Sequence, residues 1–211
     1  MSSADAVAAE AARKLFAGPC DFIWGATSID NLPPATLPEV AFVGRSNAGK
    51  SSLLNALTGR KTLARVSNTP GRTRQINFFN LGGKLVLADL PGYGYARASK
   101  SLADEWQNLI FAYLRGRANL SRVILLVDAR RGAMDTDKQA MGLLDQAAVS
   151  YVLALTKIDQ LSAAERVKAE DGITNESRSH TAAYPQIFST SALKSLGLDA
   201  LKAHIAALAA T

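Results

Sequence analysis

The chain has 211 residues, with 24 Lys and Arg against 18 Asp and Glu, which gives a formal net charge of +6. This length can form one domain with its own hydrophobic core, and a composition of 48% hydrophobic and 20% charged residues excludes a wholly disordered chain. The longest apolar runs, such as Val123 to Val127, are far shorter than the roughly 20 residues of a membrane-spanning helix. We therefore expect no membrane segment.

The N-terminus lacks a basic segment followed by an apolar one, so we expect no secretory signal and a cytoplasmic location. A single cysteine, Cys20, excludes an intramolecular disulfide, which agrees with a reducing compartment. The positive net charge permits an acidic partner, with nucleic acid as the first choice. We expect the chain to act as a monomer.

Residues 1–36 are predicted to be an extension. Residues 5–16 are Ala-rich and are followed by Gly18-Pro19, which predicts a short helix and its end. The prolines within Asn31 to Pro34 then indicate a linker or an edge segment. We expect residues 37–211 to form the main domain.

From residue 39 onward, short apolar runs alternate with segments of helical period. The predicted strands are Val40–Val43, Ile76–Leu81, Leu85–Asp89, Val123–Val127, Tyr151–Leu155 and Gln186–Phe188. The predicted helices are Ser51–Thr58, Leu102–Leu114, Asp137–Gln146, Ala163–Lys168 and Leu198–Leu208. This alternation predicts an α/β fold with a mostly parallel six-stranded sheet and helices on both faces. The two strands joined by Gly82-Gly83 are too close for a crossover, so they predict a hairpin and one antiparallel strand.

A phosphate-binding motif, G-x-x-x-x-G-K-[ST], follows the first strand of this domain and opens a helix. Its residues are Gly44, Arg45, Ser46, Asn47, Ala48, Gly49, Lys50 and Ser51. Backbone N–H groups of such a loop converge on phosphate oxygens, while Lys50 reaches the β and γ phosphates and the Ser51 hydroxyl ligates magnesium. The alternative is a Gly-rich turn with an incidental lysine, but the strand, loop and helix all agree with phosphate binding.

Three further motifs follow strands. Asp89-Leu90-Pro91-Gly92 offers an aspartate for a magnesium-bound water and a glycine N–H for a γ-phosphate. Thr156-Lys157-Ile158-Asp159 offers a carboxylate for the N1–H and amino group of guanine, and Thr190-Ser191-Ala192 offers a backbone N–H for the guanine oxygen. Because open α/β sheets bind ligands at the carboxyl ends of their strands, these motifs predict a guanine nucleotide site. Asp159 could instead cap a helix that starts near Ser162.

The runs GRSNAGKSS, TPGRTR, DLPGYGYA, TKID and STSA together resemble the EngB (YihA/YsxC-type) family, within the TrmE-Era-EngA-EngB-septin-like GTPase superfamily of translation-factor-like GTPases. The resemblance implies a Ras-like P-loop G domain that binds GTP and GDP with Mg²⁺. It also implies a role in assembly of the large ribosomal subunit, with its rRNA and ribosomal proteins, and a link to cell division and septation.

The resemblance assigns further residues to the site. The switch-one segment that it implies as nucleotide-binding is Gly71, Arg72, Thr73, Arg74 and Gln75. Thr73 would ligate magnesium in this segment, although Thr69 is a rival, and Asp89 would act through a water. Catalytic roles then fall to Lys50, Thr73 and Gly92.

Three positions depart from common GTPase patterns. Tyr93 occupies the place where many GTPases have a water-orienting glutamine, so we expect slow hydrolysis. Asn47 either helps to hold a potassium ion, as in related GTPases, or merely tolerates an unusual backbone angle. Thr156 replaces the commoner asparagine, so we expect a weaker hold on the phosphate loop and a modest nucleotide affinity.

The basic residues are unevenly distributed along the chain. Between residues 60 and 74 there is no acidic residue, and the basic ones are Arg60, Lys61, Arg65, Arg72 and Arg74. A second group comprises Arg115, Arg117, Arg122, Arg130 and Arg131. The acid-free stretch predicts RNA binding that depends on the nucleotide state, whereas solvated surface charge is the alternative for any single arginine.

Two other function classes compete with a ribosome-assembly switch. A metabolic P-loop nucleotide kinase would need a lid with catalytic arginines, and we identify no such insertion in the sequence. A GTPase of RNA modification or RNA chaperoning would share every nucleotide motif and would differ in its target.

Overall fold

The structure, a computed structural model, describes residues 3–63, 75–93 and 100–210, and it describes residues 3–5, 100–107 and 210 by their backbone alone. The strands are β1 (Cys20–Ala26), β2 (Glu39–Gly44), β3 (Ile76–Leu81), β4 (Leu85–Asp89), β5 (Leu120–Asp128), β6 (Tyr151–Thr156) and β7 (Ala183–Ser189). The helices are α1 (Ser3–Ala17), α2 (Lys50–Thr58), α3 (Lys100–Gly116), α4 (Asp135–Ala147), α5 (Ala163–Ser177) and α6 (Leu198–Ala207). Short 3-10 turns are η1 (Ile29–Asn31), η2 (Ile158–Gln160) and η3 (Leu208–Ala210).

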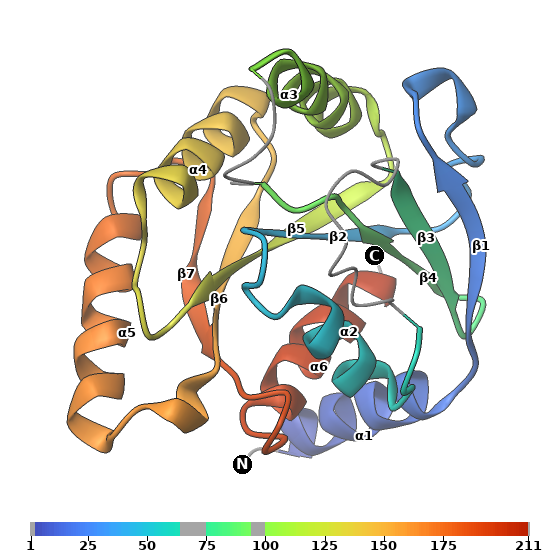
Figure 1. Cartoon of the computed structure of the whole chain (residues 1–211). Coiled ribbons are helices and arrows are strands. Elements are labelled where there is room, and N and C mark those ends of the chain that lie inside the picture. The colour runs from blue at the N-terminus through green and yellow to red at the C-terminus, as the bar shows by residue number, and fades with distance from the viewer. Residues whose placement is uncertain (1–2, 64–74, 94–99, 211) are drawn as a thin grey trace.

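The strands form one sheet in the order β1-β3-β4-β2-β5-β6-β7, with helices on both faces (Figure 1). Strand β3 is antiparallel to both of its neighbours, β1 and β4, and the remaining pairs are parallel. The predicted α/β fold and its single reversed strand are therefore confirmed. The sheet has seven strands rather than six, because the N-terminal extension contributes β1.

Alternating side chains of the central strands feed two cores, one on each face of the sheet. Val40 and Phe42 of β2 pack with helices α1, α2 and α6, whereas Ala41 and Val43 pack with α3, α4 and α5. This is the period of two expected of a strand that is covered on both faces. The carboxyl ends of the parallel strands therefore meet at one rim of a rigid sheet.

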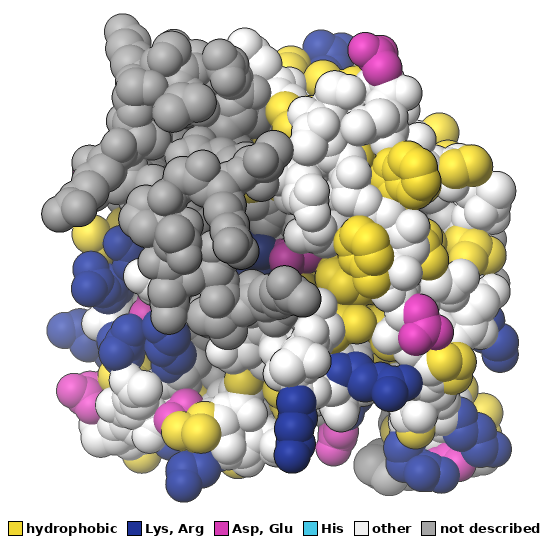
Figure 2. Space-filling view, turned by 45° about the vertical axis from the view of Figure 1, so that its right-hand side comes forward, with side chains coloured by type: hydrophobic (Ala, Val, Ile, Leu, Met, Phe, Trp, Pro, Cys, Tyr) yellow, Lys and Arg dark blue, Asp and Glu magenta, His cyan; other side chains and the backbone are white. Residues whose placement is uncertain are grey.

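The extension is built onto the domain at two places. Helix α1 packs against α6, where the side chain of Phe16 is buried, and β1 closes the edge of the sheet beside β3. The register of β1 shifts between Phe22 and Trp24, which breaks the alternation of the strand. Phe22, Ile23 and Trp24 are consequently all exposed, and Figure 2, turned to bring this side forward, shows hydrophobic side chains gathered there.

A buried ion pair fixes the amino end of β2. The Glu39 carboxylate is fully buried, and it accepts hydrogen bonds from the Arg117 guanidinium at 2.9 Å and from the Tyr113 hydroxyl. Arg117 also donates to the Pro33 carbonyl oxygen at 2.7 Å. The pair thus joins β2, the end of α3 and the segment that leads into the domain.

Three arginines of the second group are engaged in contacts within the fold. Arg117 is inside the Glu39 ion pair, Arg122 stacks over the Tyr184 ring at 4.4 Å, and Arg130 pairs with Asp128. The partners of Arg117 and Arg122 come from distant parts of the chain, and the partner of Arg130 is a buried carboxylate. A count of charges along the sequence shows neither kind of contact.

Among the described residues, no helix is both long and apolar enough to cross a membrane.

Candidate functional site

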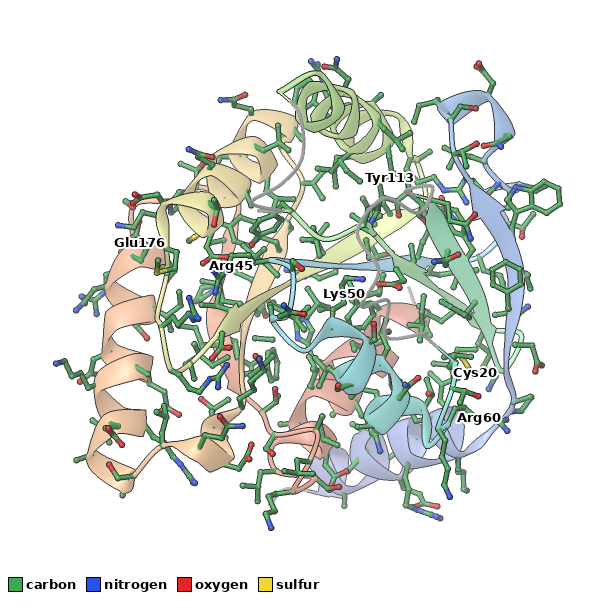
Figure 3. The ribbon with its side chains drawn as sticks, viewed as in Figure 1. Cys20, Arg45, Lys50, Arg60, Tyr113 and Glu176 are labelled. Carbon is green, nitrogen blue, oxygen red and sulfur yellow. The ribbon has the colours of Figure 1, made fainter. Side chains whose placement is uncertain are left out.

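The phosphate loop connects β2 to α2. The backbone turns through left-handed conformations at Asn47 (φ of 67°) and at Gly49 (φ of 94°), directly before the helix. At Gly44 the backbone passes close to β5, because a Cβ at this position would lie only 3.0 Å from the Cβ of Leu126. Figure 3 shows Lys50 at the amino end of α2, where the first backbone N–H groups of a helix have no helical acceptor. This is the geometry of an anion-binding loop.

Lys50 forms an ion pair with Asp89. The ammonium group donates to Oδ1 of the carboxylate, and both side chains are nearly buried. Asp89 lies at the end of β4, on the strand next to β2, so the predicted phosphate lysine and the predicted aspartate of the magnesium site converge from two elements. The two residues balance each other's charge within the site.

The segment after β4 lies directly on the phosphate loop. Ser46 N–H donates to the Tyr93 carbonyl oxygen at 2.8 Å, and Tyr93 N–H donates to the Gly44 carbonyl oxygen at 3.3 Å. A Cβ at Gly92 would lie 3.3 Å from the same Gly44 oxygen, so a side chain at this position would press on the loop backbone. The glycine predicted to sense a γ-phosphate is therefore held against the loop.

Tyr93 is anchored away from this loop by its hydroxyl. The buried hydroxyl donates to the Asp137 carboxylate of α4 at 2.8 Å, and Asp137 also accepts from Met134 N–H at 2.9 Å. Burial, followed by the neighbouring Asp137 carboxylate, raises the pKa of Tyr93 well above its ordinary value. The phenol therefore stays neutral and serves as a packing anchor.

The base motif, Thr156 to Asp159, holds the phosphate loop through two of its side chains. The Thr156 hydroxyl donates to the Ala48 carbonyl oxygen at 2.6 Å, and the Lys157 ammonium donates to the Asn47 carbonyl oxygen at 2.6 Å. The shorter side chain of threonine thus reaches the loop, and the weaker hold and modest nucleotide affinity stay predictions. The backbone at Asn47 is left-handed, as the conformational reading of that residue requires, and this angle does not test the role of its side chain.

Asp159 lies in the short turn η2, and its carboxylate does not cap a helix. Helix α5 is capped by Ser162, whose N–H donates to the Glu165 carboxylate at 2.8 Å while its hydroxyl accepts from Glu165 N–H at 3.4 Å. The alternative reading of Asp159 as the cap is therefore wrong. Among the described residues, none donates a hydrogen bond to the Asp159 carboxylate, so its oxygens are available to a base.

The third motif forms a tight loop beside this carboxylate. Thr190 is fixed to β6, because its N–H donates to the Leu155 carbonyl oxygen at 2.7 Å. Ser191 N–H donates to the Leu196 carbonyl oxygen at 3.0 Å, so of the two predicted donors only Ala192 N–H remains for a guanine oxygen. Gly197 closes the loop with a φ of 68°, and a Cβ there would lie 2.0 Å from the Ser189 carbonyl oxygen.

The sequence analysis missed Asp128 at the end of β5. Its buried carboxylate accepts from Arg130 at 2.6 Å and from the Lys157 ammonium at 2.9 Å. Burial acts to raise the pKa of Asp128, but the hydrogen bonds from Arg130 and Lys157 outweigh it and hold the pKa below its ordinary value. Its position in the sequence could have indicated a role in the site, since Asp128 ends a strand at the same rim as the three motifs.

The switch-one residues Gly71, Arg72, Thr73 and Arg74, with the rival Thr69, lie outside the described residues, so their roles remain predictions. Gln75 is described, and its amide donates to the Asn77 side chain at 2.7 Å. The other motifs, at residues 44–51, 89–92, 156–159 and 190–192, follow β2, β4, β6 and β7 as expected.

The residues of the site suit magnesium by their chemistry. Ser51 contributes a hydroxyl from the first turn of α2, and Asp89 has a second carboxylate oxygen besides the one that binds Lys50. Mg²⁺ prefers oxygen ligands, keeps several waters and needs few protein ligands. In the part of the chain that the structure describes, no group of three His, Cys, Asp or Glu side chains could hold a metal.

The chain is similar to known GTP-binding proteins. Residues 39–157 match the family model described as 50S ribosome-binding GTPase, and residues 111–210 match the elongation factor Tu GTP binding domain. The chain is 50% identical over 97% of its length to the probable GTP-binding protein EngB of Cereibacter sphaeroides, and it covers 94% of that protein. It is 54% identical over 94% of its length to the protein of the same name in Caulobacter vibrioides, of which it covers 87%.

Solved structures share the fold. A crystal structure of a probable GTP-binding protein engB matches with a TM-score of 0.64 and 23% identity, over 82% of this chain and 98% of that one. Era from Aquifex aeolicus, bound to GDP and aluminium fluoride, matches with a TM-score of 0.63 and 24% identity, over 82% of this chain and 56% of that one. Era in complex with MgGDPNP and part of 16S ribosomal RNA gives a TM-score of 0.62 and 23% identity, with the same coverage.

Gly197 offers a steric test of the loop at residues 190–197. Gly197→Ala is expected to displace this loop, lower the free energy of unfolding by more than about 2 kcal/mol and weaken GDP binding. Gly59→Ala is the matched control, because Gly59 has a similar φ of 64° but open space around it, so only about 1 kcal/mol of backbone strain is expected. Urea denaturation and GDP titration of both variants measure this, and equal losses in the two would contradict it.

Proposed function

The chain belongs to the EngB family of GTP-binding proteins and is a GTPase, and we propose that its nucleotide cycle works as a switch in assembly of the large (50S) ribosomal subunit. Normal cell division and septation would depend on that assembly. One observation supports the switch best, namely that Lys50 of the phosphate loop is paired with Asp89, the first residue of the motif at residues 89–92, with which the proposed second switch begins. Any ligand that binds one of these residues changes the state of the other.

The geometry of the site supports the proposed nucleotide contacts. The phosphates compete with Asp89 for the Lys50 ammonium, and the released Asp89 carboxylate can then accept from a magnesium-bound water. Ser51 would ligate Mg²⁺, which when bound supplies positive charge to the β and γ phosphates. Gly92 lies against the loop, and its N–H would meet a γ-phosphate, while the Asp159 carboxylate with Ala192 N–H would select guanine.

We propose that hydrolysis is slow without an activator. Tyr93 stands where a water-orienting glutamine is common, and its hydroxyl is bonded to Asp137 instead. The catalytic contribution of the chain then rests on Lys50, on Gly92 and, as the resemblance implies, on Thr73. Such a site suits a switch whose state persists until a partner acts on it.

The ribosomal target is supported by likeness and by charge. The matching family model is described as ribosome-binding, and Era, which shares the fold, has been solved with ribosomal RNA. In this chain, Arg60 and Lys61 are exposed just beyond α2 and begin the acid-free basic stretch. Charge placed next to a switch can couple RNA phosphate binding to the nucleotide state.

Replacing Asp159 tests the base assignment. Asp159→Asn is expected to weaken GTP binding by a factor of up to roughly 10⁴ and to favour XTP, because the carboxylate that accepts two guanine N–H groups is lost. Competition binding with GTP and XTP measures the exchange. Asp171→Asn, which alters an exposed carboxylate on α5, is the control and should change neither. Unchanged GTP affinity in Asp159→Asn would refute the base assignment.

Co-sedimentation with ribosomal subunits tests the target. We expect binding to large subunits or their precursors with GTP or a non-hydrolysable analogue, weaker binding with GDP, and a loss of binding as salt is raised. Removing Arg60 and Lys61 together should reduce the salt dependence, whereas removing the exposed Lys168 and Arg178 of the α5 region should not. Absence of binding in every nucleotide state would rule out the ribosomal target and leave an RNA-modifying or RNA-chaperone role as the alternative.

A potassium ion at Asn47 is a further part of the proposal. The Asn47 carbonyl oxygen binds Lys157, which fixes the loop backbone and leaves the side chain as the group that would contact the ion. Turnover is expected to be faster in potassium than in sodium salts at equal ionic strength, and Asn47→Ala should remove the difference. Equal rates in both salts for the unsubstituted protein would contradict a potassium role.

A further inference from the structure

Asp128 is a buried carboxylate that the nucleotide contacts proposed above do not use. It is 5% exposed at the carboxyl end of β5, between the strands that hold the phosphate loop and the base motif. One oxygen accepts from Arg130 Nε at 2.8 Å, and the other accepts from Arg130 Nη2 at 2.6 Å and from Lys157 Nζ at 2.9 Å. A negative charge this close to an anion-binding loop requires an explanation.

The two cations around Asp128 have different surroundings. The Arg130 guanidinium is 40% exposed and also donates to the Gln160 side chain at 2.8 Å, so it grips the carboxylate from the solvent side. Lys157 reaches it from the loop side, where its ammonium also donates to the Asn47 carbonyl oxygen. Arg130 therefore fixes the carboxylate, and the carboxylate fixes the lysine.

The stem of Lys157 lies in a defined place as a result. Its Cε would be 3.6 Å from a Cβ built on Gly49, so the aliphatic chain runs across the phosphate loop to reach its two acceptors. Its backbone has a φ of 61°, in the left-handed region. A flexible lysine would sample many rotamers, whereas one bound at both acceptors presents one apolar flank.

We infer that Asp128 is a positioning residue for the nucleotide base, which acts by fixing the Lys157 ammonium so that the stem of Lys157 forms one wall for the guanine ring. Arg130 supports it by holding the carboxylate in place. The inference rests on the proposed function, since it assumes that guanine binds beside Asp159. It adds a residue of β5 to a site otherwise formed after β2, β4, β6 and β7.

A purely structural role is the competing explanation, because a buried carboxylate with paired cations can simply stabilise the fold. The two explanations differ in their dependence on Lys157. If Asp128 acts through Lys157, removing the ammonium leaves Asp128 nothing to position, so the effects of the two substitutions on the base are not additive. If Asp128 stabilises the fold, the effects are independent.

The test is a double-mutant cycle on the GDP dissociation rate, measured with fluorescent GDP, for Asp128→Asn, Lys157→Met and the double variant. We expect Asp128→Asn to release GDP about tenfold faster, since one charge-assisted hydrogen bond to Lys157 is lost. In the Lys157→Met background the same substitution should change the rate by less than about twofold. Asp145→Asn neutralises a carboxylate paired with His180 at 2.6 Å on another element, and as the control it should leave the rate unchanged.

The outcomes separate the inference from the proposed function. A tenfold effect of Asp128→Asn that persists in the Lys157→Met background would overturn the positioning role, as would no effect in either background. If the unsubstituted protein binds no GDP, the proposed function itself fails. Should Asp128→Asn not fold, Arg130→Gln replaces it in the same cycle, with about threefold faster release expected only when Lys157 is present, and an equal effect without Lys157 would overturn the inference.

Discussion

The hydrogen bond from the Thr156 hydroxyl to the Ala48 carbonyl oxygen connects the two halves of the site. One half is the phosphate loop after β2, and the other is the base motif after β6, on strands separated by β5. Both strands are covered on both faces, so neither end can move without disturbing a packed core. The distance between the phosphate and base subsites is thereby set by the sheet, and the side chains of Thr156 and Lys157 hold the loop to it.

The second switch begins from the same fixed loop. Gly92 and Tyr93 are bound to the loop backbone, while the Tyr93 hydroxyl is bound to Asp137 of α4. A change at Gly92 can therefore reach α4, which lies on the opposite face of the sheet from α2, through the buried hydrogen bond from Tyr93 to Asp137. The Lys50–Asp89 ion pair adds a charge-dependent link between the loop and the switch. Only another anion can take the place of Asp89 as the partner of the Lys50 ammonium.

The motifs could be predicted from the sequence because each depends on a local pattern. A glycine-rich turn between an apolar strand and a helix, or a carboxylate at the end of an apolar run, is visible within about ten residues. Strand β1 could not be predicted, since its register shift between Phe22 and Trp24 removes the alternation by which strands are recognised. The roles of Asp128 and Arg117 depend on partners that only the fold brings near, namely Lys157 and Glu39. Charge along the sequence likewise could not separate the arginines of internal ion pairs from those at the surface.

The packing of α1 against α6 imposes an order on folding during synthesis. Helix α1 has its main partner in α6, which lies far along the chain, so Phe16 cannot be buried against α6 until the residues of α6 have been synthesised. Contacts between such distant segments form late, because closing a long loop costs conformational entropy. The core on this face of the sheet is therefore completed only after α6 has been synthesised. A protein truncated before α6 would keep every phosphate-loop residue and still lack the packed support that holds the loop in shape.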